Sequence, residues 1–300
     1  MHRERSLHQV LERNFKSNSD DHAHIYCKHY YPIGKLPKKF IHIIFQHGLI
    51  EYHHRHEDLF DALRNHFGKN LVISTMDLYG HGLSGGDRAF IDTFDTFVKD
   101  MQYFFQDCYD LLYEGSELET FMIAHSLGGL ITIKTLSQEL AQLPFSIKGL
   151  VLTNPCIAPK IELPAKVVKI ADHIPEAVAK VKIPLIYDAY DLSHDEDKAI
   201  SFMHDHLISK SVTIKLGVEI INATKSVNSL SYFFNFPTLF ILSNDDRLVD
   251  IEKVELFLTG MDKSLAQKKR YPKMRHDILN ETCRSDVFRE IIKYIEGKRV

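Results

Sequence analysis

Short apolar runs alternate with segments of helical periodicity along most of the chain. The runs have the length and the β-branched and aromatic content of buried strands, and the segments between them repeat apolar side chains at helical spacing. This alternation predicts an α/β fold, in which helices flank a mostly parallel central sheet on both faces. The predicted core strands are residues 40–45, 71–76, 121–124, 148–153, 237–242 and 268–271. The predicted helices are residues 54–67, 93–113, 130–140, 252–258 and 281–296.

Two parts of the chain depart from this rhythm. Residues 24–31 alternate and are rich in aromatic side chains, which predicts an edge strand after a polar leader. Residues 156–234 contain several helical patterns and no convincing core strand. We interpret them as a helical cap inserted into one α/β domain made of residues 1–155 and 235–300. Within the cap, residues 164–181 predict a pocket wall, with a membrane contact or an ordinary packed helix as alternatives.

The composition narrows the class of protein. Hydrophobic residues at 44% and charged residues at 26% are ordinary for a globular protein, and a formal net charge of -3 gives no indication of a nucleic-acid partner. The four cysteines are far apart in the sequence, which favours buried thiols over a metal cluster and indicates a reducing compartment. No secretory signal or membrane-spanning stretch is present in the sequence, so we expect a cytoplasmic protein, with peripheral membrane contact left open.

The sequence around Ser126 predicts a strand, a sharp turn and a helix in immediate succession. Such a turn holds a serine hydroxyl at the carboxyl end of a sheet as a nucleophile, in a strained backbone that only small neighbours such as Ala124 and Gly128 permit. The amide of Leu127 would then point at a developing oxyanion. The usual pattern is Gly-x-Ser-x-Gly, and Ala124 stands in its first position. A helix N-cap serine beside a glycine-rich turn is the alternative interpretation.

Candidates for a base and an orienting acid follow the last two core strands. Asp245 and Asp246 come after residues 237–242, and His276 comes after residues 268–271. A serine nucleophile needs both groups, and loops at the carboxyl ends of parallel strands are where such sites collect. Either aspartate could instead cap the next helix, and a histidine in a loop is no surprise in a chain with 18 histidines.

A second backbone donor is predicted after the strand at residues 40–45. Gly48 allows the chain to turn sharply there, so that the amide of Leu49 can lie opposite the amide of Leu127. Two aligned N–H donors would complete an oxyanion hole, which contributes about 3 kcal/mol or more to stabilising a transition state.

Taken together, these stretches resemble the monoacylglycerol lipase and lysophospholipase branch of the α/β-hydrolases, of the serine aminopeptidase S33 (Hydrolase_4) type. The matching residues are His47-Gly48 with Glu51 and Arg55, residues 77–85, residues 125–129, residues 244–249, and His276. They span most of the predicted α/β domain, and their combination in this order is specific to the family.

The resemblance implies a role for each candidate residue. Ser126 is matched to the nucleophile, His276 to the base, and the amides of Leu49 and Leu127 to the oxyanion hole. Asp246 is preferred to Asp245 as the acid, because the family's acid directly precedes an arginine and Arg247 follows Asp246.

The sequence therefore predicts a serine hydrolase that cleaves carboxylic esters of monoacyl lipids, such as monoacylglycerols or lysophospholipids, through an acyl-enzyme and without a cofactor or metal ion. The cap matches the family only loosely, around residues 192–195, so other substrates stay open: small esters, an amide or peptide bond, or acyl transfer to an alcohol. A non-catalytic hydrolase fold used for binding is the alternative from another class of function. Head group, chain length and oligomeric state stay open.

Two further motifs are compatible with other functions. Residues 80–85 fit Gly-x-Gly-x-x-Gly after a strand, but a dinucleotide site needs a helix that opens directly from the motif, and residues 86–88 continue the loop. The resemblance instead assigns Asp77 and His81 to holding the backbone of this loop. Residues 53–58 resemble a metal-binding histidine run, but their helical phase favours the polar start of a helix.

Overall fold

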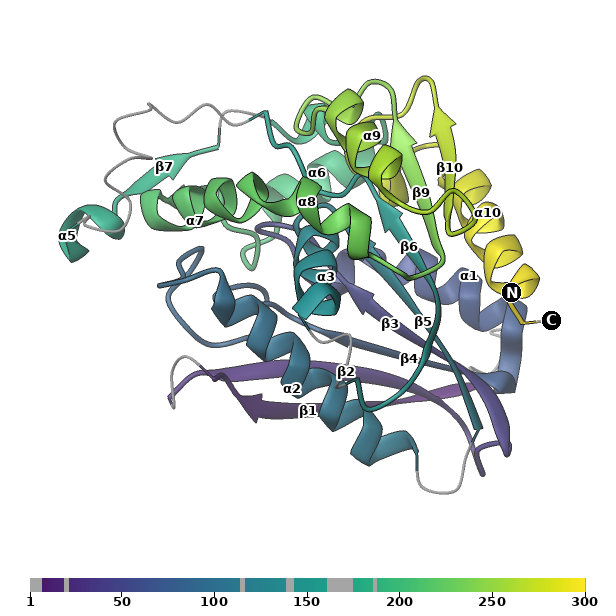
Figure 1. Ribbon diagram of the computed structural model, residues 1–300. Helices are drawn as coiled ribbons and strands as arrows, with labels where there is room; N and C mark the ends of the chain where they lie inside the picture. The colour runs from purple at the N-terminus through teal and green to yellow at the C-terminus, as the bar shows by residue number, and fades with distance from the viewer. Residues whose placement is uncertain are drawn as a thin grey trace.

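An eight-stranded sheet forms the centre of the protein (Figure 1), with the order β1-β2-β4-β3-β5-β6-β9-β10. The computed structural model describes residues 7–18, 22–113, 117–138, 143–160, 175–185 and 188–299. The strands are β1 (His8–Lys16), β2 (His24–Pro32), β3 (Lys39–Gln46), β4 (Leu71–Met76), β5 (Glu117–His125), β6 (Ile147–Thr153), β9 (Thr238–Ser243) and β10 (Ala266–Tyr271). Neighbouring strands from β4 to β10 are parallel, whereas β1–β2 and β2–β4 are antiparallel. The predicted mostly parallel α/β fold is therefore confirmed.

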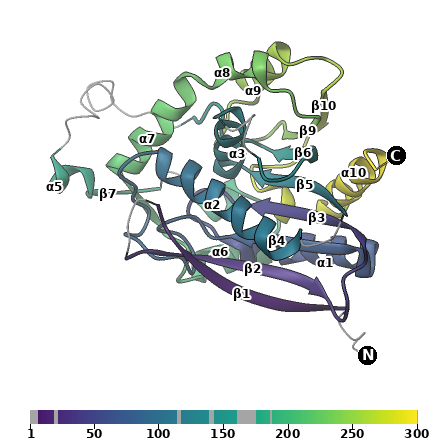
Figure 2. The same ribbon diagram turned by 60° about the horizontal axis from the view of Figure 1, so that its bottom comes forward.

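Helices cover both faces of the sheet (Figures 1 and 2). On one face, α2 (Asp95–Leu112), α3 (Leu127–Gln138) and α9 (Ile251–Gly260) pack into one hydrophobic cluster with the strands. On the other face, α1 (Glu57–Phe67) and α10 (Arg284–Gly297) pack into a second cluster. Alternate side chains of β3 point into the two clusters, with Ile44 in the first and Ile43 and Phe45 in the second. This two-sided burial explains why the core strands are continuous apolar runs rather than alternating ones.

The edge of the sheet differs from the prediction. Residues 8–16, interpreted as part of a polar leader, form the edge strand β1, and β2 lies inside the sheet between β1 and β4. The side chains of β1 are exposed at most positions, so the strand lacks the apolar pattern that marks a half-buried strand. It is held by backbone pairing with β2 over its whole length, from His8 opposite Pro32 to Lys16 opposite His24. Backbone pairing leaves no signature in side-chain hydropathy.

The chain between β6 and β9 forms short helices and a small separate sheet. Its described elements are α5 (Glu176–Ala179), β7 (Lys182–Pro184), η4 (Ala189–Asp191), α6 (Glu196–His204), β8 (Ser211–Thr213), α7 (Ile214–Lys225), α8 (Val227–Leu230) and η5 (Ser231–Phe233). β7 and β8 pair with each other and stay outside the central sheet. Most of the predicted pocket wall at residues 164–181 lies outside the described residues. Its last part forms α5, which protrudes from the body of the protein in Figures 1 and 2.

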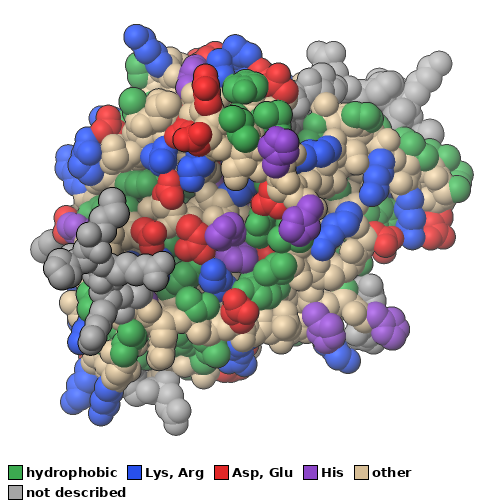
Figure 3. All heavy atoms as spheres, turned by 180° about the vertical axis from the view of Figure 1, so that it is seen from behind, with side chains coloured by type: hydrophobic (Ala, Val, Ile, Leu, Met, Phe, Trp, Pro, Cys, Tyr) green, Lys and Arg blue, Asp and Glu red, His purple; other side chains and the backbone are tan. Residues whose placement is uncertain are grey.

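Ion pairs attach the part of this segment around α6 to the helices α1 and α10. Asp58 of α1 lies 2.9 Å from Lys198 of α6 and 2.9 Å from Arg284 of α10. Arg284 also contacts Asp195 just before α6, at 2.7 Å. Figure 3 shows this side of the molecule, where acidic and basic side chains are interspersed. Each of these half-buried pairs contributes about 1 kcal/mol or less, so the main effect of the network is to fix where α6 docks.

The cysteines mostly follow the prediction of buried thiols. Cys27, Cys108 and Cys156 are buried, and Cys283 is exposed at the position before α10. Among the described helices, none is both long and apolar enough to cross a lipid bilayer.

A buried carboxyl group makes the stability of the fold depend on pH. Asp100 of α2 accepts hydrogen bonds from the Ser17 hydroxyl and the Asn18 backbone N–H, all at 3.0 Å. Burial raises the pKa of Asp100 from its ordinary value to about 6. Because the folded-state pKa lies above the unfolded one, this group stabilises the fold at low pH, and that contribution is lost as the pH rises through about 6.

We therefore expect Asp100→Asn to raise the free energy of unfolding by about 1–3 kcal/mol at pH 8 and by much less at pH 4. Urea denaturation at the two pH values measures this. The exposed Asp110 in the same helix supplies a matched control, Asp110→Asn, which should shift stability little at either pH. An equal gain from Asp100→Asn at both pH values would contradict the role of its charge.

Candidate active site

Ser126 stands on a strained turn between β5 and α3. The strand ends at His125 and the helix begins at Leu127, so Ser126 alone makes the turn, with φ of 51°. This left-handed conformation is uncommon for a residue other than glycine. A Cβ atom at Gly128 would lie 2.5 Å from the backbone oxygen of His47, so only glycine fits there. Ala124 packs its methyl group in the core, which explains why alanine is accepted in the first position of the motif.

The three predicted polar side chains form one continuous hydrogen-bonded chain. Ser126 Oγ lies 2.8 Å from His276 Nε2, and His276 Nδ1 lies 2.7 Å from Asp246 Oδ2. The other carboxylate oxygen of Asp246 accepts from the backbone N–H groups of Leu248 and Val249 at 2.8 and 2.9 Å. Because the carboxylate can only accept, His276 carries its proton on Nδ1, which leaves Nε2 free to accept the proton of Ser126.

The structure also distinguishes the two neighbouring aspartates. Asp246 is buried against His276, whereas Asp245 is exposed and its Oδ2 lies 3.9 Å from Arg275 Nε. The loops after β5, β9 and β10 thus bring Ser126, Asp246 and His276 together, as the sequence predicted, and leave Asp245 at the surface.

The charges around His276 favour its protonated form. Burial disfavours the imidazolium form of His276, but the nearby carboxylates of Asp246, Asp277 and Glu51 outweigh it and raise the pKa of His276 above its ordinary value. Burial likewise opposes ionisation of Asp246, but His276 and the two backbone donors lower its pKa. The aspartate is therefore ionised and ready to stabilise a histidine that becomes protonated.

Leu49 and Leu127, whose amides are the predicted oxyanion donors, both lie beside Ser126. Both residues line the cavity that contains Ser126. Leu127 is the first residue of α3, so its N–H has no acceptor within the helix. The Gly48 loop approaches closely, since a Cβ atom at Gly48 would lie 3.1 Å from Ser126 Cβ. The two backbone segments that carry the predicted donors therefore flank the serine.

A largely apolar cavity of about 470 Å³ opens from Ser126 and His276. Much of its wall comes from the segment between β6 and β9. The apolar wall residues of this segment are Ile183, Leu185, Leu192, Phe202, Val212, Ile214 and Ile220. A cavity with these walls and a reactive serine at one side can accommodate an aliphatic chain.

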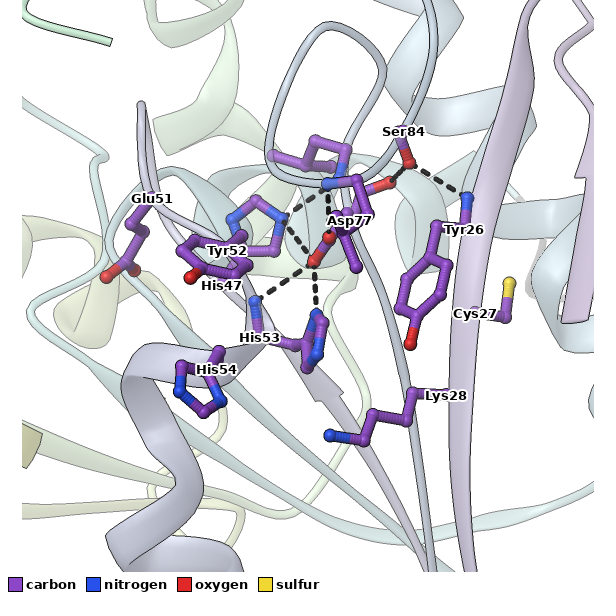
Figure 4. Close-up of polar contacts among 12 residues, drawn as sticks. Tyr26, Cys27, Lys28, His47, Glu51, Tyr52, His53, His54, Asp77 and Ser84 are labelled. Atoms are coloured by element: carbon purple, nitrogen blue, oxygen red, sulfur yellow. Dashed lines mark hydrogen bonds and ion pairs between the residues drawn. The ribbon is translucent and has the colours of Figure 1, made fainter. Parts of the chain in front are cut away.

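The loop after β4 supports the site without entering it. Asp77 Oδ1 accepts from the backbone N–H of His53 at 3.0 Å and lies 2.8 Å from His53 Nδ1, while Oδ2 accepts from the Leu83 N–H at 2.9 Å (Figure 4). His81 Nδ1 donates to the backbone oxygen of Tyr79 at 2.8 Å. Residues 80–85 form turns and bends, and residues 53–56 form the short helix η1 before α1. Asp77 and His81 thus fix the backbone of this loop, and Asp77 also fixes the backbone at His53.

Sequence reasoning missed one residue that joins the site together. Asn154, directly after β6, has φ of 42°. Its side-chain amide donates to the backbone oxygen of His276 at 2.7 Å, and its carbonyl accepts from the Ser243 N–H at 2.8 Å. It ties the ends of β6 and β9 to the loop that carries His276. The sequence signal that could have identified Asn154 is an asparagine, a residue that tolerates positive φ, directly after a buried strand.

Solved structures identify the class of fold. A thermostable carboxyl esterase from Bacillus coagulans has a TM-score of 0.78 at 17% identity, covering 97% of this chain and 99% of that one. The monoacylglycerol lipase of Paleococcus ferrophilus has a TM-score of 0.73 at 18% identity, covering 97% of this chain and 99% of its own. The protein has the α/β-hydrolase fold.

The family follows from the sequence match. A model described as serine aminopeptidase, S33, covers residues 37–283, and the chain belongs to this family, Hydrolase_4. Phospholipase YtpA of Bacillus subtilis is 26% identical over 251 residues, which cover 82% of this chain and 92% of that protein. Human monoglyceride lipase is 27% identical over 282 residues, which cover 93% of this chain and 88% of that protein. The protein is thus a lipase/esterase-type α/β-hydrolase.

Because Gly128 packs directly against the backbone of Gln46 and His47, it should not tolerate a methyl group. A Cβ atom there would lie 2.5 and 2.6 Å from the oxygens of His47 and Gln46, which cannot move independently of the sheet. We expect Gly128→Ala to lower the free energy of unfolding by about 1–3 kcal/mol in chemical denaturation. The control is Gly297→Ala, whose new methyl group would meet nothing within 4 Å. Equal stability of both variants and wild type would contradict this packing.

Proposed function

We propose that the protein hydrolyses carboxylic esters of monoacyl lipids, such as monoacylglycerols or lysophospholipids. Ser126 is the nucleophile, His276 the base, Asp246 the orienting acid, and the amides of Leu49 and Leu127 form the oxyanion hole. The observation that carries the proposal is the hydrogen-bonded chain from Ser126 through His276 to Asp246, with contacts of 2.8 and 2.7 Å, beside a largely apolar cavity.

The reaction proceeds in two halves. Ser126 Oγ attacks the ester carbonyl carbon while its proton moves to His276 Nε2, and the carbonyl oxygen becomes an oxyanion that accepts from the two amides. The carbon–oxygen bond to the alcohol then breaks, and His276 donates its proton to the leaving alcohol. Water attacks the acyl-enzyme with His276 again as the base, and the fatty acid and Ser126 are regenerated.

The substrate class is supported by the cavity and by the relatives. One relative is called a phospholipase and another a monoglyceride lipase, and both names imply an acyl ester on a polar head group. The apolar walls suit the acyl chain, and we propose that residues 156–234 form a cap that supplies them, on a domain of residues 1–155 and 235–300. A short-chain carboxylesterase is the second candidate, because one solved relative of this fold is a carboxyl esterase.

Hydrolysis of a homologous series of monoacyl esters tests this function. We expect fatty acid release to increase from short to long acyl chains and to fall at least ~10⁴-fold in Ser126→Ala. The control is Ser137→Ala, at a serine near the end of helix α3, which begins directly after Ser126. This variant should retain wild-type activity. A rate that peaks at the shortest chains would favour the carboxylesterase, and undiminished activity of Ser126→Ala would refute the nucleophile.

The pH profile tests the roles of His276 and Asp246. The pKa of His276 is lowered by burial but raised on balance by neighbouring carboxylates, so kcat/KM should fall as the pH drops through a value above the ordinary 6.5. In Asp246→Asn one of these carboxylates is gone, so this acidic limb should move to lower pH and kcat should fall by about 10⁴-fold. Asp245→Asn, at the exposed neighbour, should leave the profile in place. A profile of Asp246→Asn that matches wild type would contradict the assignment.

A further inference from the structure

The two peptide groups that flank the Cα atom of Gly48 are each held by a side chain. His47 Nδ1 donates to the backbone oxygen of Gly48 at 2.8 Å, and Glu51 Oε1 accepts from the backbone N–H of Gly48 at 2.6 Å. The carbonyl of Gly48 and the N–H of Leu49 belong to one planar peptide group and point in opposite directions when it is trans. A side chain that fixes the Gly48 oxygen therefore also fixes the direction of the Leu49 N–H.

His47 is itself held in one orientation and one tautomer. Its Nε2 accepts from the backbone N–H of Leu78 at 2.9 Å, so the ring proton lies on Nδ1, which faces Gly48. A protonated ring would place a second N–H against the N–H of Leu78. The ring is fully buried, and burial lowers the pKa of His47 despite the nearby Asp77 and Glu51 carboxylates. The neutral imidazole is therefore the form that fits this loop.

Glu51 is a buried carboxylate that lies beside Arg55 and His56. Arg55 Nε lies 3.3 Å from Glu51 Oε2, and His56 Nε2 lies 3.1 Å from Oε1. Burial opposes ionisation of Glu51, but the neighbouring His56, His125 and Arg55 side chains lower its pKa well below the ordinary value. The carboxylate thus offers the Gly48 N–H a charged acceptor, which makes a stronger hydrogen bond than a neutral one.

The loop that these groups hold is strained. Ile50 has φ of 60°, which is an outlier for a β-branched residue. Its side chain is 2% exposed and packs with Leu192 and Phe202 from the segment that walls the cavity. Strain of this kind persists only where the surroundings determine the conformation, and it concentrates at functional sites.

We propose that His47 and Glu51 are positioning residues that aim the Leu49 N–H at the oxyanion. The inference rests on the proposed function, because it assigns the Leu49 amide to the transition state. Neither side chain needs to touch the reacting atoms, and both act through the Gly48 peptide groups. Their loss should reduce binding of the transition state much more than binding of the substrate.

Three variants test the proposal. His47→Phe keeps a ring and removes both nitrogen contacts, Glu51→Leu removes the acceptor, and Glu51→Gln keeps an oxygen that can accept from Gly48. We expect His47→Phe and Glu51→Leu to lower kcat about 10²–10³-fold, as for loss of one oxyanion donor, with KM changed less than about threefold. Glu51→Gln should lose less than about tenfold, because it retains the hydrogen bond.

Two inhibitors separate positioning from a general loss of structure. A long-chain trifluoromethyl ketone adds to Ser126 and forms a tetrahedral oxyanion, whereas the fatty acid product binds without one. In His47→Phe and Glu51→Leu, the inhibition constant of the ketone should rise by the same factor as kcat/KM falls, and that of the fatty acid should stay within about threefold. Equal weakening of both inhibitors, or unchanged kcat in folded variants, would overturn the proposal.

The control is His42→Phe, at a fully buried histidine within β3. The His42 ring lies 2.9 Å from Ser74 Oγ and contacts no loop of the site, so this variant should leave the ratio of the two inhibition constants unchanged. If His47→Phe does not fold, the comparison of Glu51→Leu with Glu51→Gln tests the positioning role.

A wild-type protein that hydrolyses no ester would reject the proposed function and this inference with it. Wild-type activity that requires Ser126 but is indifferent to His47 and Glu51 would reject the positioning role alone.

Discussion

The left-handed turn at Ser126 is the constraint on which the rest of the site depends. With φ of 51°, it joins β5 directly to α3 and leaves the hydroxyl at the carboxyl edge of the sheet. The turn persists because Gly128 packs directly against the backbone of β3 and its following loop, and because β5 is buried between two parallel neighbours. A strained residue thus stands at the end of an interior strand that is paired on both sides, which holds its geometry in place.

Buried ionisable groups surround this turn and are matched to one another. Asp246 contacts His276 directly, and Asp277 follows His276 in the sequence. Arg55 forms an ion pair with Asp277. Glu51 connects Arg55 to the backbone of Gly48. Removing one member leaves a buried charge without its partner, which is more damaging than the loss of a surface pair. The same set of charges that shifts the pKa of His276 therefore also holds the loop of the proposed backbone donor Leu49.

The segment between β6 and β9 contributes in two ways. It provides apolar walls to the cavity, and it packs Leu192 and Phe202 against Ile50 of the loop that follows Gly48. The guanidinium of Arg55 also stacks on the Phe202 ring, at 4.8 Å from its centre. The cavity walls and the loop that carries the proposed backbone donor Leu49 are thus in direct contact, so their geometries are linked through packing.

Features with a local cause could be predicted from sequence. The parallel sheet follows from apolar runs buried on two faces, and the turn at Ser126 follows from the small residues that backbone sterics require beside it. Features that depend on distant contacts could not be predicted in this way. β1 has no side-chain signature because it is held by backbone pairing, and hydropathy does not distinguish Asp246 from Asp245, of which only the first reaches His276. The bond from the Leu78 N–H to His47 forms only when β3 and β4 lie side by side, and because it occupies Nε2 it leaves Nδ1 to donate to the Gly48 oxygen.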